Sequence, residues 1–214
     1  MLEKLREEVW KANISLFKCG LVTMHSGNAS GRDFETGFVI IKPSGIDYET
    51  LKPNNLVIVD KTGQTIEGNL NPSVDTPIHL FLYKNLPEIG GIIHTHSNYA
   101  TSFAALGMSI PAYLTAIADE FGNLIPCTEF ASNEGDEIGK AILKVKNDSP
   151  AVLLKNHGVF TLDTSPKKAL KAAVMVEDIA KTVHLALIKG KPNILPPEEV
   201  NKWWDRYHNK YGQH

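Results

Sequence analysis

The sequence contains little that would mark a secreted, disulfide-rich or membrane-bound protein. Cysteine occurs only at Cys19 and Cys127, which lie far apart and lack metal-type spacing. This pattern favours two reduced thiols over a disulfide framework. No apolar run reaches the roughly 18 residues of a membrane span, and the charged start MLEKLREEVWK lacks the apolar segment of a signal peptide. We therefore expect a soluble cytoplasmic protein.

A strong excess of charge is also missing. The formal net charge is −2 and the basic residues form no dense run, so the electrostatic footprint of a nucleic-acid-binding or membrane-binding protein is absent. A small anionic substrate remains compatible with this charge. The chain has 214 residues, of which 43% are hydrophobic and 21% charged, and this is enough to bury a substantial core. Since repeats and clear linkers are lacking, we expect residues 1–214 to form a single domain.

The hydrophobic pattern predicts both helices and strands. Apolar residues at helical spacing predict an opening helix that ends at Gly20, and FVIIKPSG, LVIVD and QTIEG predict strands. The segment AVLLKNHGVFTLD predicts two strands or one interrupted strand. Further helices are predicted at residues 77–86, 97–106, 134–146, 166–190 and 203–211. Because strands occur partly in hairpins and partly between helices, we expect an α/β fold with a mixed sheet.

Two histidines follow a strand-like apolar run in GGIIHTHS, residues 90–97. Side chains two residues apart in a strand point to the same side, so His94 and His96 would face one point in space. This pair alone is a weak signal, and ordinary polar or core histidines are the alternative. His157, between an apolar strand and a glycine, is a third candidate. Asp75 is a fourth, although an Asp before Thr-Pro is also a good helix start. Three imidazoles and one carboxylate suit Zn²⁺, while spacing leaves Mn²⁺ and Co²⁺ open.

A second polar cluster is rich in glycine and comprises HSGNASG, residues 25–31, and KPSG, residues 42–45. Backbone N–H groups in such turns can bind anions, and Asn28, Lys42 and Ser44 could add donors and a positive charge. Neither GxxxxGK[ST] nor GxGxxG occurs, so the common nucleotide-binding loops are absent. Plain turns remain the alternative for each loop taken alone.

Together these motifs resemble a known family. SGNAS, KPSG, PSVDTP, GGIIHTHS, SIPAYLTAIAD with IPCT, LLKNHGVF and the closing YGQ occur in the order and near the spacing of the class II aldolase and epimerase family, which includes adducin-like domains. Within it, the chain most resembles the L-ribulose-5-phosphate 4-epimerases. The resemblance covers nearly the whole chain. It implies a three-layer α/β/α fold around a largely antiparallel sheet, assembled as a cyclic homotetramer with active sites between subunits.

The resemblance also implies roles for individual residues. The ligands of a divalent metal, usually zinc, would be Asp75, His94, His96 and His157. The residues implied to bind substrate, chiefly its phosphate, are Gly27, Asn28, Lys42, Ser44, Gly45, Ser73 and Thr115.

Three positions, Asp75, Thr115 and Asp119, separate the epimerases of this family from its fuculose-phosphate aldolases. Asp75 replaces a glutamate of the aldolases, and Thr115 replaces a tyrosine. Asp119 matches an acid/base aspartate of the epimerases, and Tyr211 matches a tyrosine supplied by a neighbouring subunit. The implied reaction interconverts L-ribulose 5-phosphate and D-xylulose 5-phosphate by breaking and remaking the C3–C4 bond. We expect Asp119 to work beside the metal of its own subunit. Without the resemblance, Asp119 and Tyr211 would be a helix-end aspartate and an exposed tail tyrosine.

Two residues depart from the family pattern. Val74 replaces a serine that helps to bind phosphate, and Trp203 stands near the position of a phosphate-contacting histidine. His79 is expected on a helix face, where it could orient a metal ligand.

The alternative activity is that of a class II aldolase acting like L-fuculose-1-phosphate aldolase, or of a sugar-phosphate dehydratase. A non-catalytic adducin-like module should have lost metal ligands, which are all present here.

Overall fold

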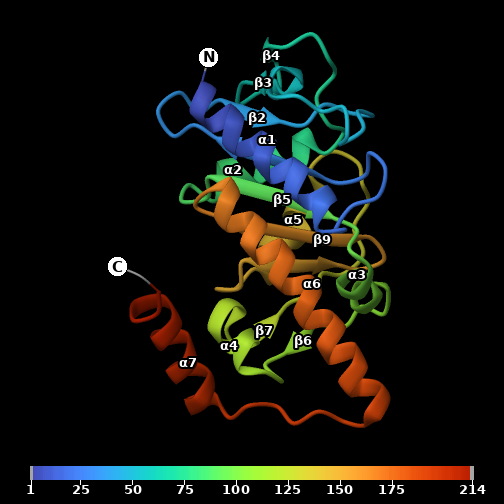
Figure 1. Ribbon diagram of the computed structural model, residues 1–214, viewed down its shortest axis with the longest axis vertical. Helices are drawn as coiled ribbons and strands as arrows, with labels where there is room; N and C mark the ends of the chain where they lie inside the picture. Colours follow the sequence, from blue (N-terminus) through green and yellow to red (C-terminus); the bar gives the residue numbers. More distant parts are fainter. Residues whose placement is uncertain (1, 213–214) are drawn as a thin grey trace.

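An antiparallel sheet of seven strands, in the order β4-β3-β2-β1-β5-β9-β8, forms the centre of the protein. Figure 1 presents the computed structural model, which describes residues 2–212. The strands of this sheet are β1 (Asn28–Arg32), β2 (Val39–Ile41), β3 (Val57–Val59), β4 (Thr65–Glu67), β5 (Gly91–Thr95), β8 (Ala151–Leu154) and β9 (Gly158–Asp163). A second sheet pairs β6 (Ile110–Pro111) with β7 (Leu124–Ile125).

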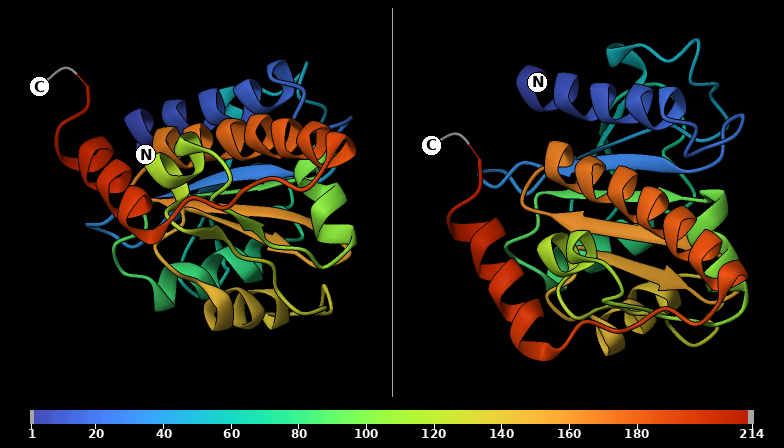
Figure 2. Two further views of the ribbon diagram at one scale, coloured as in Figure 1. Left: turned by 90° about the horizontal axis from the view of Figure 1, so that it is seen from below. Right: turned by 60° about the horizontal axis from the view of Figure 1, so that its bottom comes forward.

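Helices cover both faces of the large sheet. They are α1 (Glu3–Lys18), α2 (Thr76–Asn85), α3 (Asn98–Ala105), α4 (Thr115–Phe121), α5 (Glu137–Val145), α6 (Pro166–Lys189) and α7 (Pro197–Asn209), with a short 3₁₀ helix η1 (Pro53–Asn55). Figure 2 shows α1 and α6 together on one face and α2 with α5 on the other. The three-layer α/β/α fold with a largely antiparallel central sheet is therefore confirmed. Within the described residues, no helix is both long and apolar enough to cross a membrane.

The strands are apolar on both sides because both faces of the sheet are covered. Along β2, Val39 packs in the core beneath α2 and α5, whereas Ile40 packs in the core beneath α1. In β5 the same alternation places Ile92 on the α2 side and Ile93 on the α1 side. His94, two residues after Ile92, therefore points to the α2 side of the sheet.

Most predicted helices are present, and residues 151–163 form two separate strands. The expectation of a mixed sheet is wrong, because every registered strand pair is antiparallel. The connections through helices join β4 to β5 and β5 to β8, which run in the same direction but are not neighbours, because antiparallel strands lie between them. The last helix begins at Pro197 instead of residue 203. The thiols of Cys19 and Cys127 are free, as predicted.

Strand β1 differs from the sequence-based expectation, which was a polar turn. Ala29 and Gly31 face α1, where a Cβ atom on Gly31 would lie 2.7 Å from a methyl carbon of Val9. On the other face, the Ser30 hydroxyl lies 2.7 Å from Nδ1 of His79. On the face toward α1 the strand has small residues, and on the other face it has a polar residue that forms a hydrogen bond. It therefore lacks the alternation of apolar and polar residues that predicts a strand. The short elements β6, β7 and α4 were also missed.

Candidate active site

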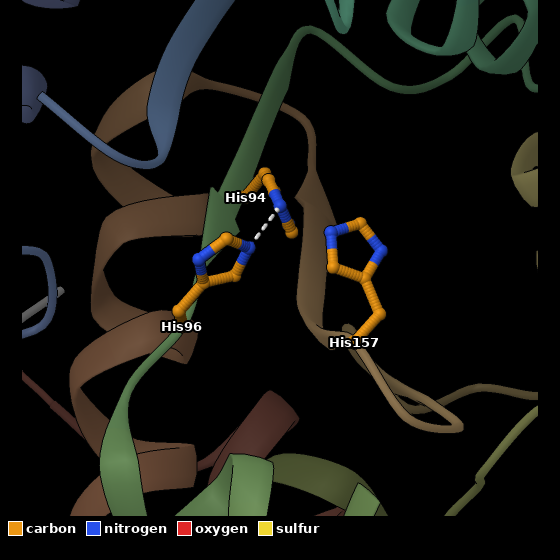
Figure 3. Close-up of side chains that lie close together, drawn as sticks. All are labelled: His94, His96 and His157. Atoms are coloured by element: carbon orange, nitrogen blue, oxygen red, sulfur yellow. Dashed lines mark hydrogen bonds between the residues drawn. The ribbon is translucent and has the colours of Figure 1, made fainter. Parts of the chain in front are cut away.

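Three histidines converge at the end of β5. His94 belongs to the strand, His96 lies just beyond it, and His157 lies in the turn between β8 and β9. Their rings face a common space in Figure 3, and one nitrogen of each lies within 4.8 Å of the others. The prediction that His94 and His96 point to the same side is confirmed, and His157 joins them from a distant part of the sequence. This arrangement can hold a metal ion.

The hydrogen bonds of His94 leave a nitrogen lone pair directed at this space. Nδ1 of His94 lies 3.0 Å from the carbonyl oxygen of Val159, which can only accept, so Nδ1 carries the proton. Nε2 of His94 is then unprotonated and lies 2.9 Å from Nε2 of His96. Burial holds the pKa of His94 well below its usual range and also lowers the pKa values of His96 and His157. Neutral imidazoles are the form that binds metals.

Gly158 is needed for the turn to approach the histidines so closely. A Cβ atom at this position would lie 2.5 Å from the carbonyl oxygen of Thr95 and 2.7 Å from Cδ2 of His96. Any other residue would push the turn, and with it His157, away from β5. The glycine that follows His157 in the sequence is therefore part of the site geometry.

Asp75 begins α2, as its position before Thr76 and Pro77 predicts, but its side chain does not cap the helix in the described structure. Instead its Oδ2 accepts a hydrogen bond of 2.7 Å from Nδ2 of Asn28. Its charge raises the pKa values of His96 and His157, against the larger effect of burial. Asp75 therefore lies beside the histidines, although outside the group that they form. Three imidazoles and an adjacent carboxylate fit a divalent metal such as zinc.

One cavity of about 270 Å³ brings the candidate ligands together with the glycine-rich loops. Its lining residues are His25, Ser26, Gly27, Asn28, Lys42, Pro43, Ser44, Gly45, Ser73, Val74, Asp75, His94, His96, Asn133 and His157. Every predicted metal ligand is included, as is every residue predicted to bind substrate except Thr115. Asn133 was not identified from the sequence, because nothing in its loop before α5 indicates a position in the cavity.

Lys42 brings a positive charge to the cavity. Its residue is 1% exposed, and its ammonium lies 3.3 Å from the carbonyl oxygen of His25 and 4.7 Å from the centre of the Tyr48 ring. Burial lowers the pKa of Lys42 to about 8. An anion in the cavity would offset the cost of burying this charge. The backbone N–H groups of Ser44 and Ser73 already donate within the protein, to Asn71 and Lys42, so these serines have only their hydroxyl groups to offer.

Asp119, Thr115 and Tyr211 lie outside this cavity. Asp119 and Thr115 belong to α4, which packs on α7. Burial raises the pKa of Asp119, while the charges of Arg206 and His208 on α7 lower it. The Arg206 guanidinium lies 5.3 Å from the centre of the Tyr211 ring. Figures 1 and 2 show α4 and α7 side by side, away from α3 and the end of β5. Asp119 and Tyr211 thus share a surface that is separate from the histidines of the same chain.

His79 lies behind the histidine cluster and is fully buried. The Phe160 ring lies 5.5 Å from the His79 ring and stacks on the His94 ring at 4.7 Å. Burial lowers the pKa of His79 to about 3, so this imidazole is neutral. Its Nδ1 bonds to Ser30, and it supports His94 through Phe160 without bonding to a candidate ligand.

Comparisons with known proteins find solved structures with a similar fold. A solved structure described as an L-fuculose 1-phosphate aldolase is 32% identical, with a TM-score of 0.87 over 95% of this chain and 96% of that one. YgbL from Escherichia coli, described as a putative aldolase/epimerase/decarboxylase, is 26% identical, with a TM-score of 0.81 over 94% and 98% of the two chains. An L-fuculose-1-phosphate aldolase from Thermus thermophilus, 21% identical with a TM-score of 0.73 over 88% and 98%, shares the fold.

The model of the class II aldolase and adducin N-terminal domain matches residues 7–184, a range that contains the histidine cluster and all other residues of the cavity. A match over most of the chain, with the cavity inside it, identifies the family: the chain belongs to the class II aldolase and adducin N-terminal domain family.

Proposed function

We propose that the protein is a metal-dependent L-ribulose-5-phosphate 4-epimerase. The observation that carries the proposal is the single cavity in which Asp75 and three histidines adjoin Asn28, Lys42 and the KPSG loop. Such a cavity suits a substrate with oxygen ligands at one end and a phosphate at the other. Asp75, Thr115 and Asp119 favour the epimerase over the aldolase, on the family pattern described above.

The chemistry explains why a metal and an anion site are needed together. The C4 hydrogen of the ketose is not adjacent to the C2 carbonyl, so inversion by simple proton abstraction is difficult. Cleavage of the C3–C4 bond is easier. When bound, a divalent metal acts as a Lewis acid that stabilises the negative charge left on the C2 and C3 oxygens. Lys42 and Ser44 hold the phosphate of the released aldehyde, which turns over before it is attacked on its opposite face.

Each face of the aldehyde needs an acid/base group for the C4 hydroxyl, and a positioned group contributes about 10²- to 10⁴-fold. We assign Asp119 and Tyr211 to these roles. Because both lie on the surface formed by α4 and α7, outside the cavity of their own chain, we propose that a neighbouring subunit of a cytoplasmic homotetramer supplies both. This revises the expectation that Asp119 works beside its own metal.

The second candidate function is a class II aldolase that releases the aldehyde. It is favoured by the likeness to the L-fuculose 1-phosphate aldolase, which extends over nearly the full length of both chains. Either reaction uses the same cavity, and they differ in whether the aldehyde stays bound until it is re-attacked. The test is therefore the product.

The first prediction concerns that product. Metal-replete protein incubated with L-ribulose 5-phosphate should form D-xylulose 5-phosphate, followed by NMR, because the phosphate keeps the aldehyde in the cavity. His157→Ala protein serves as the control for contaminating activity. Accumulation of glycolaldehyde phosphate and dihydroxyacetone in place of the epimer would instead identify an aldolase.

The second prediction concerns the metal. His157→Ala should lose bound zinc and activity but keep its fold, because the cluster lies at the end of the sheet and is not needed to build the core. Metal content would be measured by elemental mass spectrometry and folding by circular dichroism. His25→Ala is a matched control, since His25 lines the same cavity but lies outside the cluster. Stoichiometric zinc in the His157→Ala protein would refute the assignment.

The third prediction concerns the phosphate. A hydrogen bond to a charged group contributes about 1.5–3 kcal/mol, so Ser44→Ala should raise KM roughly 10- to 100-fold. Its metal content should not change. Asn28→Ala is less informative, because Asn28 also bonds to Asp75. Ser102→Ala, on the exposed side of α3, is the control. An unchanged KM for Ser44→Ala would mean that the phosphate binds elsewhere.

The fourth prediction concerns the shared site. If Asp119 and Tyr211 act together on the neighbour's metal, mixed oligomers of His157→Ala and Asp119→Asn chains contain complete sites. Random mixing at equal amounts should restore about one quarter of wild-type turnover, because one pairing in four joins an intact cavity to an intact α4/α7 surface. Mixtures of Asp119→Asn with Tyr211→Phe should remain inactive. Differently tagged chains would verify the hybrids. The opposite pattern would assign Asp119 to the metal of its own chain.

A further inference from the structure

Helix α3 connects two of the candidate metal ligands. It begins at Asn98, two residues after His96, and its last turn reaches the β8–β9 turn that carries His157. Figure 1 shows α3 at the end of β5, next to that turn. The position of this helix therefore bears on the distance between the two imidazoles.

The N-terminal end of α3 is held by a residue from another helix. The first N–H groups of a helix have no partner within it, and the side chain of Ser97 does not cap α3 in the described structure. Glu177 of α6 takes this role with both carboxylate oxygens. Its Oε1 accepts the N–H of Tyr99 and its Oε2 accepts the N–H of Ala100, each at 2.9 Å. A negative charge at this end of a helix is also favourable for the helix dipole.

The C-terminal end of α3 is held by the residue that precedes His157. The backbone N–H of Asn156 donates to the carbonyl oxygen of Ala104 at 3.0 Å, and its side-chain Nδ2 donates to Ala105 at 3.3 Å. These carbonyls belong to the last turn, where acceptors also lack partners within the helix. Asn156 has a φ of 60°, a left-handed conformation that asparagine tolerates better than most residues.

We propose that Glu177 and Asn156 are positioning residues for the metal centre. By clamping the two ends of α3, they set the spacing between His96 and His157, although neither residue lines the cavity. These contacts of Glu177 and Asn156 with α3 explain why the candidate ligand nitrogens lie within 4.8 Å of one another. A site assembled in advance binds more tightly, because less ordering remains to be done when the ion enters. The inference rests on the proposed function only in requiring that the histidines bind metal.

The test measures zinc affinity directly, by competition of purified apoprotein with a chromophoric chelator. Glu177→Gln keeps the shape of the side chain but replaces one acceptor with an NH₂ group that faces a backbone N–H. Zinc Kd should rise about 10- to 100-fold, the usual effect of removing a group that orients a ligand. Asp178→Asn is the matched control, since Asp178 is the exposed next residue of α6, and its Kd should equal that of wild type.

Asn156→Gly supplies a second variant. Glycine keeps the left-handed backbone and the N–H bond to Ala104 but removes the bond to Ala105, so Kd should rise by less than in Glu177→Gln. A purely structural role predicts something different: lower thermal stability of the apoprotein with an unchanged Kd. A wild-type zinc Kd in folded Glu177→Gln protein would overturn the inference. If Glu177→Gln does not fold, a wild-type zinc Kd in Asn156→Gly protein would overturn it. Wild-type protein that binds no divalent metal would overturn the proposed function as well.

Discussion

The registered pairing of β5 with its two neighbours determines where the groups of the cavity lie. On one side, β1 places Asn28 directly opposite His94, and on the other, β9 pairs Val159 with Thr95 just after the turn that carries His157. A slip of one residue in either pairing would turn a whole set of side chains to the other face of the sheet. The core protects against such a slip, because it would exchange the residues packed beneath α1 with those beneath α2. The same apolar contacts that stabilise the fold therefore also align the ligands.

The cavity contains polar atoms that a structure optimised for stability alone would satisfy. Among the described residues, Oδ1 of Asn28 and Nδ1 of His157 are buried without a hydrogen-bond partner, and the carboxylate of Asp75 leaves its helix uncapped. An unpaired buried polar group costs about 1–3 kcal/mol, and Lys42 adds a buried charge. Asn28, Lys42, Asp75 and His157 all line one cavity, and an anion bound there would offset the buried charge of Lys42.

The parts of the site that the sequence predicted depend on local geometry. The alternation of a strand is sufficient to pair His94 with His96, and the end of an apolar strand marks His157 as a candidate, whereas the roles of the other cavity residues came from the resemblance to the family. Distant contacts were not predictable in this way. The polar strand β1 owes its position to small residues under α1, Asn133 reaches the cavity through a loop of no distinctive pattern, and the strand directions follow from the paths of the connections. Each depends on which elements meet in space, for which a single sequence contains no periodic signal.

The separation of the site into two surfaces bears on how one fold supports related reactions. The residues proposed to bind metal and phosphate lie on the large sheet and its connections, whereas Thr115 and Asp119 lie on α4, which packs on α7 outside that cavity. If a neighbouring subunit supplies α4 and α7, their side chains can change without disturbing the register of β5. An aldolase and an epimerase could then share the same cavity and differ in the acid/base groups brought to it. On this view a likeness of 32% to an aldolase over 95% of this chain does not distinguish the two reactions.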